Sequence, residues 1–492
     1  MRNNEQIKSV FEHPKMEELQ EQLFGSFETT KIVLPSLVKP CILGQTREQL
    51  SSSGMLDTLT MTKCSQNPNV CFYTTKTEYG PTVAQSNNQS NLSTQKNFVM
   101  VNDKLHLIGY PYSIKLCGNV FHDEIMSSFR FFEANEGTVL RVFKIGEVWY
   151  TTTNKKPDAF KGKWASKKNT FGIHLANELV RKFKNADDGE RVEGEEDDQN
   201  FEDQELARNY VNRIWEQSLN PNKKYFFLLK PCEEERVVCY PSACRLLNIG
   251  LLNEENVLTL DEDVQLTNGT QTVTVAKPTE RSFKSANEFD CELEKLNPLE
   301  VPGFIAIATK TQEGTDIESD ICNAFHVKIL SHQYWGLYAL RNNVPSLRFR
   351  LLQLSYFGHH RKDFLPYNKF VVLYKKEIEH SIKIFNYVDH HIALDLHAKY
   401  MARVRTTTFG GAGAGHLHDS SLKQEITPPI QNVLNIIHNE FRVEKSKNPT
   451  RKIITTVAKI QKILRFIKPE TLNKLIKEYE RCAKRASTIE AV

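Results

Sequence analysis

Several features that would assign a protein to a class at once are missing from this chain of 492 residues. No apolar run approaches the roughly 18–20 residues of a membrane-spanning helix, and residues 1–19 lack the apolar core of a secretory signal. The 10 cysteines are scattered and contain no CxxC pair. These absences predict no membrane partner and a reduced, cytoplasmic compartment.

Metal-ligand patterns are also lacking. The closest cysteines, Cys232, Cys239 and Cys244, do not have the paired spacing of a zinc site. Histidines gather at residues 359–360, 390–397 and 416–418, but none stands in an HExxH or zinc-finger arrangement. The glycine-rich stretch 410–415 lacks the Lys-Ser/Thr of a phosphate-binding loop and predicts a flexible linker. The sequence therefore predicts no metal site.

The charge is unevenly distributed, although the net charge is only +4. Residues 185–206, NADDGERVEGEEDDQNFEDQEL, form an acidic block with almost no apolar residues, which predicts a mobile surface insertion. Without this block the chain is basic, and a basic surface favours a polyanionic partner, first of all a nucleic acid. On charge alone, an ordinary solvated surface explains the excess of lysine and arginine equally well.

Hydrophobic periodicity divides the chain into three parts. Residues 1–104 begin with an amphipathic helix over 1–25 and continue with strand-like runs, KIVLPSLV the first of them, and a polar loop at 84–97. Residues 105–355 hold a hairpin-like stretch over 129–153 that turns at Gly146, two strands within 223–240, the strands GFIAIATK and FHVKILS, and two amphipathic helices. Residues 356–492 are mostly helical and end in two basic helices split at Pro469. The predicted fold class is α+β, with antiparallel sheets, flanking helices and a helical C-terminal domain.

Short motifs follow one another through the middle part. EANEGTVLRVF opens the hairpin, KKYFFLLKPCEEERVVCY comes next, and VPGFIAI precedes FHVKILSHQYWGLYALRNNVPSLRFRLLQL. This order resembles the nucleotidyltransferase core of the phage-type RNA ligases, and most closely the RNA-ligase-like proteins of large cytoplasmic DNA viruses, the asfarvirus kind included. The resemblance spans roughly residues 105–400. It implies nucleotidyltransferase-like antiparallel sheets around a nucleotide-sized cleft.

The resemblance also implies a chemistry. Ligases of this family attack ATP with a lysine, pass AMP to an RNA 5′-phosphate and displace it with a 3′-hydroxyl, while carboxylates hold magnesium ions. The position of the motif lysine, three residues before the motif glycine, is occupied by Ala134. The third-motif acid falls at Phe227 or Leu228, and the fourth-motif glutamate falls at Pro302, with Glu300 nearby.

Other residues match the family in kind. Lys328 is implied to face the phosphates, and Lys155 and Lys156, on the returning strand of the hairpin, are alternatives for the catalytic lysine. Lys115 also stands three residues before a glycine, but the hairpin follows it too soon. The resemblance further implies that the nucleotide is bound by Glu136, Gly137, Arg141 and Arg236. We therefore expect Arg141, the strand end 151–156 and Lys328 to line one cleft.

Two hypotheses of function stay open. The first is ATP-dependent RNA end joining with degenerate motifs, for which ATP and magnesium are the expected cofactors. The second is a non-catalytic RNA-binding or virion scaffold protein that keeps the ligase fold; a purely structural, capsid-associated role is a third. Single-stranded RNA is the expected partner. The basic C-terminal helices fit phosphate contacts and an ordinary amphipathic bundle equally well, and WASKKN at 164–169 fits base stacking but fits a solvated turn slightly better. Other virion proteins are further expected partners, and the expected location is the host cytoplasm or the virion.

Overall fold

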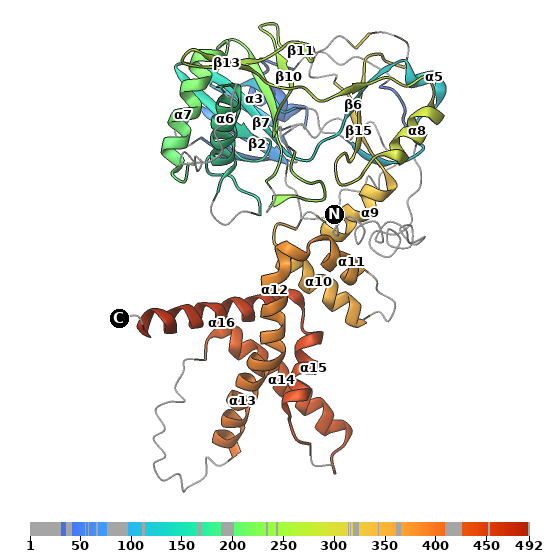
Figure 1. Ribbon diagram of the computed structural model, residues 1–492. Coiled ribbons are helices and arrows are strands. Elements are labelled where there is room, and N and C mark those ends of the chain that lie inside the picture. Colours follow the sequence, from blue (N-terminus) through green and yellow to red (C-terminus); the bar gives the residue numbers. More distant parts are fainter. Residues whose placement is uncertain are drawn as a thin grey trace. The chain divides into compact units, whose positions relative to one another are not determined.

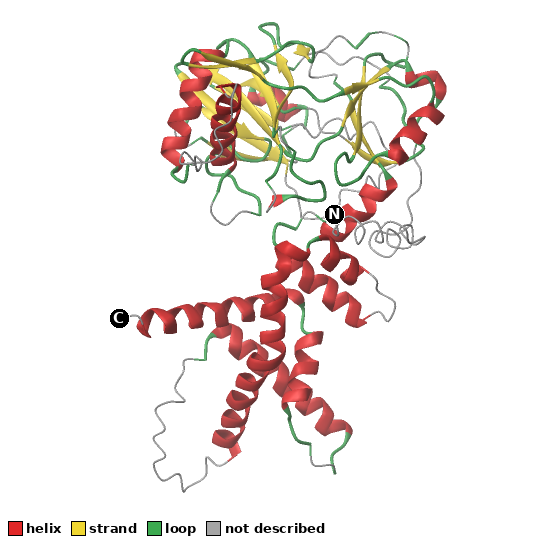
Figure 2. Ribbon diagram, in the orientation of Figure 1, coloured by secondary structure: helices red, strands yellow, loops and turns green. Residues whose placement is uncertain are grey.

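The computed structural model describes residues 31–490, with gaps at 36–41, 55, 58, 65–66, 76–96, 111–113, 166–168, 188–200, 233–234, 243–244, 313, 315, 318–323, 343, 361–365, 409–425 and 451–452. The described chain divides into two compact units, residues 31–345 (the sheet unit) and residues 346–490 (the helical unit). The described strands all belong to the sheet unit, and the helical unit consists of helices (Figure 2). The predicted fold class is confirmed.

One five-stranded antiparallel sheet has the order β11-β10-β9-β7-β8. Its strands are β7 (Thr138–Ile145), β8 (Val148–Thr153), β9 (Lys224–Leu229), β10 (Leu246–Leu252) and β11 (Leu258–Thr259). The hairpin of β7 and β8 was predicted, and Gly146, at a φ of 59°, makes its turn. Helices α6 (Phe171–Asp187) and α7 (Gln204–Ser218) lie side by side on one face of this sheet (Figure 1) and share an apolar core with it.

A second five-stranded sheet has the order β14-β6-β15-β16-β5 and is antiparallel except for the pair β16–β5. Its strands are β5 (Ile114–Cys117), β6 (Phe129–Glu133), β14 (Glu280–Arg281), β15 (Gly303–Ala308) and β16 (His326–Leu330). Helices α5 (Asp123–Met126) and α8 (Ala286–Lys295) accompany it, and α9 (His332–Arg341) follows β16. The predicted strands GFIAIATK and FHVKILS are therefore present as β15 and β16.

The sheet unit also contains a four-stranded sheet in the order β1-β2-β3-β4, with β1 (Leu59–Lys63), β2 (Val70–Thr75), β3 (Phe98–Val101) and β4 (Lys104–Ile108). This sheet and α3 (Arg47–Ser52) share a core with Phe143, Tyr150 and Phe226 of the first five-stranded sheet. A small two-stranded sheet, β12 (Gln265–Asn268) with β13 (Gln271–Thr274), completes the unit.

Three local predictions are wrong. Residues 236–240 form no strand, because the backbone amides of Val237, Val238 and Cys239 donate to the Glu136 carboxylate instead of to a neighbouring strand. Of the predicted run KIVLPSLV, residues 31–35 are extended but join no sheet, and the rest lies outside the described residues. The stretch 129–153 is not a single hairpin, since β6 belongs to the second sheet and the chain crosses to the first at residues 134–137. The predicted helix over 1–25 and residues 84–96 of the predicted loop lie outside the described residues.

The helical unit has a core of its own, to which α13, α14, α15 and α16 contribute Leu396, Val433, Ile460 and Leu475. Its helices are α10 (Leu347–His360), α11 (Pro366–Leu373), α12 (Lys375–Tyr387), the π-helical turn Val388–Ile392, α13 (Ala393–Thr408), α14 (Pro428–Lys447), α15 (Val457–Phe466) and α16 (Pro469–Glu490). The predicted pair of basic helices is present as α15 and α16, and Pro469 is the first residue of α16.

Candidate functional site

A cleft of about 460 Å³ lies between the two five-stranded sheets. Its walls are largely apolar, formed by Tyr110, Phe132, Val139, Leu228, Ile249, Leu260, Ile305 and Ile307. Small-molecule sites commonly measure about 300–1,000 Å³ and combine apolar walls with a few polar groups. The cleft therefore has the size and lining of a site for a nucleotide-sized ligand.

Three cationic side chains border the cleft: Arg130 on β6, Lys328 on β16 and Lys277 just before β14. The Lys328 ammonium donates to the backbone oxygen of Asn135 at 3.3 Å, which directs it toward the β6–β7 crossing. The Lys277 ammonium pairs with Asp263 at 2.6 Å and also donates to the backbone oxygen of Asp261. The three side chains together place positive charge beside the apolar walls of the cleft.

The carboxylates of the cleft are held by arginines. Arg130 donates to both Asp261 oxygens at 2.7 and 3.0 Å and to both Glu280 oxygens at 2.7 and 2.8 Å. These hydrogen bonds lower the pKa of Asp261 and of Glu280. Glu133, the third carboxylate of the lining, pairs with Arg281. This clamp ties β6, β14 and the segment after β11 together.

This donor set does not fit the magnesium ions of ligase chemistry. A magnesium site requires carboxylate oxygens that are available as ligands. Each of the three carboxylates that line the cleft has an arginine partner instead. The fourth-motif candidate, Glu300, does not line the cleft either, and it accepts from the Asn297 side chain at 2.9 Å.

The position of the motif lysine holds an alanine and is also inaccessible from the cleft. Ala134 is fully buried, and its amide donates to the backbone oxygen of Gly303 on β15. Three residues later Gly137 lines the cleft, and a Cβ there would lie 2.6 Å from the Leu229 backbone oxygen. Only glycine permits this close approach of β7 and β9. At the third-motif position Leu228 lines the cleft, while Phe227 points into the core.

Of the predicted site residues, the cleft brings together Gly137 and Lys328, with Asn154 from the end of β8. Arg141 is buried and donates to the Thr152 hydroxyl and the Thr153 backbone oxygen, so its guanidinium holds the strand end that leads to Asn154. Lys155 and Lys156 follow Asn154 but are not among the residues that line the cleft. Their part in catalysis remains a prediction. Lys115 is placed by the strand register opposite Lys328.

Glu136 and Arg236 belong to a buried structural cluster beside the cleft. The Glu136 carboxylate accepts backbone amides from Val237, Val238 and Cys239, at 2.8 to 3.1 Å, and the Tyr334 hydroxyl at 2.8 Å. Burial, and then the charge of Glu136, raise the pKa of Tyr334 well above its ordinary value. Arg236 is buried and donates to the Val238 backbone oxygen. Neither side chain is among those that line the cleft.

Sequence reasoning missed Arg130, Lys277 and Asp261. These residues lie far apart in the chain, and the topology of the second sheet brings them together. The motif order named one of the three cationic residues, Lys328, because that lysine stands within a recognisable strand.

Comparisons with known proteins give viral relatives. No family model matches the chain. The "Immediate-early protein ICP-46 homolog" of Invertebrate iridescent virus 6 is 23% identical over 398 residues, which is 78% of this chain and 76% of that protein. The "Immediate-early protein ICP-46" of Frog virus 3 is 26% identical over 228 residues, 46% of this chain and 50% of that protein. The chain is thus a distant homologue of iridovirus proteins.

Among solved structures, the chain is similar to "Putative ATP-dependent DNA ligase from Aquifex aeolicus" with a TM-score of 0.30 and 9% identity. This likeness covers 69% of the present chain and 75% of the other. In the described residues no helix is long and apolar enough to cross a membrane.

Proposed function

We propose that this chain is a viral, nucleotidyltransferase-like protein that binds RNA and a nucleotide or RNA end without forming a lysyl-AMP. The observation that carries the proposal is the cleft between the two five-stranded sheets, which keeps Gly137 and Lys328 but has buried Ala134 at the lysine position. The motif resemblance supports the nucleotidyltransferase-like part of the proposal. The iridovirus relatives support its viral origin.

The chemistry of the cleft supports binding rather than transfer. Apolar walls that include Tyr110 and Phe132 suit a nucleobase, and the ammonium groups of Lys277 and Lys328 suit phosphate oxygens. Since the carboxylates of the lining are engaged by Arg130 and Arg281, they neutralise those arginines and not a metal ion. The resulting site can hold an anionic nucleotide by an ion pair with Lys328 and by a second ion pair with Lys277 in exchange for its Asp263 partner.

RNA end joining is the second candidate, because the amines of Lys277 and Lys328 both border the cleft. The two candidates differ in one product. The protein is incubated with ATP and magnesium, denatured, and weighed intact by mass spectrometry. We expect no adenylyl group on the chain. An adduct of one AMP that disappears in Lys277→Ala or Lys328→Ala would establish the ligase chemistry in place of mere binding.

Nucleotide binding is measured separately, by calorimetry with AMP and ATP. We expect Lys328→Ala and Lys277→Ala each to weaken binding about ten-fold, the effect of losing one charge-assisted contact of roughly 1.4 kcal/mol. Lys63→Ala is the matched control, because Lys63 is an exposed lysine of β1 outside the lining. Equal affinities in all four proteins would remove the cleft as the binding site.

RNA binding is tested by anisotropy of a fluorescent single strand at several salt concentrations. Each neutralised phosphate adds about −0.7 to the slope of log K against log salt. We expect Lys328→Ala to weaken binding, and the double variant Lys155→Ala with Lys156→Ala to reduce the slope by about one. Slopes that are the same in every variant would favour the structural-protein alternative. Residence in the host cytoplasm or virion is part of the proposal and is tested by proteomics of purified particles.

A further inference from the structure

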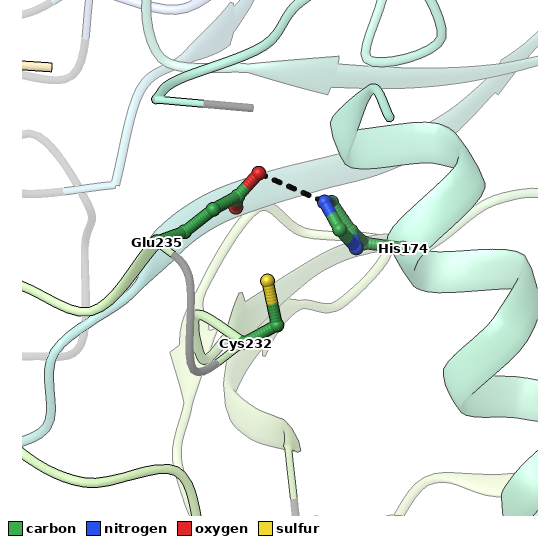
Figure 3. A group of neighbouring side chains, drawn as sticks. All are labelled: His174, Cys232 and Glu235. Carbon is green, nitrogen blue, oxygen red and sulfur yellow. Dashed lines mark hydrogen bonds and ion pairs between the residues drawn. The ribbon is translucent and has the colours of Figure 1, made fainter. Parts of the chain in front are cut away.

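Three side chains with metal-binding atoms converge at a place that sequence spacing did not reveal. His174 comes from the first turn of α6, and Cys232 and Glu235 follow β9. Their ligand atoms all lie within 4.8 Å of one another, and the His174 Nε2 and Glu235 Oε1 atoms are 2.9 Å apart. Figure 3 shows the three side chains directed toward a common point.

The backbone explains this convergence. The Glu235 amide donates to the Cys232 backbone oxygen at 3.1 Å, which holds these two residues close together. The Thr170 hydroxyl accepts the Ile173 amide at the start of α6, which fixes the turn that carries His174. Both His174 and Glu235 are buried, at 7% and 4% exposure, and Cys232 is half-buried. A buried imidazole and a buried carboxylate that are hydrogen-bonded to each other, with a half-buried thiol beside them, place three different metal-binding atoms in one small space.

From this geometry we infer a zinc-binding site made by His174, Cys232 and Glu235. Nitrogen, sulfur and oxygen ligands together match a borderline-soft divalent ion, and zinc takes these three types at about 2.0–2.3 Å in a tetrahedron. Ligand atoms of such a tetrahedron are about 3.3–3.8 Å apart, so on binding the thiol moves inward by up to roughly 1 Å. The His174 and Glu235 ligand atoms, which are 2.9 Å apart, move slightly away from each other. The thiol loses its proton to solvent, and the proton between His174 Nε2 and Glu235 Oε1 leaves Nε2, so the imidazole binds as the neutral tautomer that carries its proton on Nδ1. Thiolate and carboxylate then balance the 2+ charge.

A cavity adjoins two of the three side chains. His174 and Glu235 line a separate space of about 190 Å³, whose walls also include Trp164, Lys230 and Arg245. Three protein ligands with an open position are the arrangement of zinc sites that bind water or an anionic group. Gly137 lines both this cavity and the larger cleft, so the two sites are neighbours.

The ion would also tie structural elements together. Residues 232 and 235 precede the amides of residues 237–239 that hold Glu136, and His174 belongs to the helix that covers the first sheet. Zinc would therefore join α6 to the segment that positions the β6–β7 crossing. This inference is independent of the proposed RNA binding, because its readout is the metal itself.

The experiment uses the full chain, stripped with a chelator and titrated with zinc against a colorimetric competitor. We expect one zinc per chain in the wild type. Cys232→Ser, His174→Gln and Glu235→Gln should each bind at least about ten-fold more weakly. The Glu235→Gln variant keeps a hydrogen-bond acceptor for His174, so it separates metal ligation from packing. Cys291→Ser is the matched control, because Cys291 is exposed and outside the cluster.

Cobalt(II) gives a second readout that does not depend on the variants' stability. We expect a thiolate-to-cobalt charge-transfer band and tetrahedral visible bands in the wild type and in Cys291→Ser. Folding of each variant is checked by circular dichroism. No zinc uptake by the wild type, no thiolate band, or the same loss in Cys291→Ser as in Cys232→Ser would overturn the assignment.

Discussion

At the residue scale, the Glu136 carboxylate does a different task from the one its motif position implied. It is 8% exposed and satisfies three backbone amides and one tyrosine hydroxyl in a turn that has no strand partner. An ionised acceptor strengthens each of these hydrogen bonds and leaves no oxygen free for a ligand. Glu136, two residues after Ala134 at the motif-lysine position, is thus part of the framework of the cleft.

This assignment predicts large losses of stability. Glu136→Gln places an amide donor against backbone donors, so we expect a loss of about 3 kcal/mol of unfolding free energy in urea. Tyr334→Phe removes one charged hydrogen bond and should cost about 1.5 kcal/mol. Glu147→Gln, at a side chain that is 97% exposed, should stay within about 0.5 kcal/mol. A nucleotide-binding role without this framework role would instead leave stability unchanged and lower only the affinity.

His106 on β4 carries a pH dependence. Burial, aided by the charge of Lys224, lowers its pKa to about 4, and its Nε2 atom has no hydrogen-bond partner among the described residues. In the unfolded chain the imidazole titrates at about 6.5. Between pH 6.5 and 4 the His106 imidazole is protonated in the unfolded state but neutral in the folded state. The free energy of unfolding therefore falls as the pH falls.

The contribution of His106 is measurable by denaturation at two pH values. At pH 5 it should account for about 2 kcal/mol of the stability lost since pH 7. His106→Gln should lose correspondingly less over this interval. His122→Gln, at an exposed histidine, is the control and should follow the wild type. Parallel curves for wild type and His106→Gln would show that His106 protonates freely in the folded chain.

At the element scale, periodicity predicted what depends on neighbours in sequence. The hairpin at Gly146, helices α6 and α7, and the strands β15 and β16 follow from alternating or helical apolar spacing. The cleft required pairings between distant segments, such as Phe132 with Ile305, which periodicity cannot encode. Residues 236–240 have the composition of a strand. The amides of residues 237–239 instead donate to the buried Glu136 carboxylate, which is 101 to 103 residues away in the chain.

The acidic block has a structured end that its composition hides. Phe201 donates its amide to the Asn177 side chain and packs against Tyr210, and Asp203 accepts the amides of Glu205 and Leu206 as the N-cap of α7. An N-cap carboxylate stabilises a helix by about 1 kcal/mol. The ordered structure that follows the insertion therefore begins at or before residue 201.

Two deletions test this boundary, each closed with the same Gly/Ser linker of about eight residues, enough to span roughly 25 Å. Removing residues 188–199 keeps Phe201 and Asp203. Removing residues 187–203 takes both away, and we expect it to cost about 2 kcal/mol more in thermal or urea unfolding. Equal stabilities of the two proteins would contradict the roles of the cap and the aromatic contact.

At the scale of the whole molecule, the two units differ in net charge. Residues 346–492 contain 26 lysines and arginines against 13 aspartates and glutamates, whereas residues 1–345 contain 38 against 47. The helical unit is thus strongly basic, and the sheet unit, which holds the nucleotide-sized cleft, belongs to an acidic stretch. A basic excess confined to one unit points to that unit as the main source of phosphate contacts.

Helices α15 and α16 each have a buried apolar face and an exposed basic face, as the sequence pattern predicts. Ile460 and Leu464 of α15 and Leu475 of α16 are buried in the core. Lys462 of α15 and Lys477 of α16 are exposed, and so are Lys445 of α14 and Lys468, which lies between α15 and α16. Because packing uses the apolar face, exchanging these lysines should leave the fold of the helical unit intact.

The last prediction follows from this division. Changing Lys445, Lys462, Lys468 and Lys477 together to glutamine in the full chain should weaken binding of single-stranded RNA strongly. If each contacts one phosphate, the slope of log K against log salt should shrink by up to about 2.8.

A control variant with the same loss of charge changes the exposed lysines Lys63, Lys104, Lys284 and Lys310 of the sheet unit. This control should alter the slope by less than about 0.7, because net charge alone contributes little at a distance under physiological salt. AMP binding in the cleft should be the same in both variants, which separates the two binding activities. Equal effects of the two sets on RNA binding would place the contacts outside the helical unit.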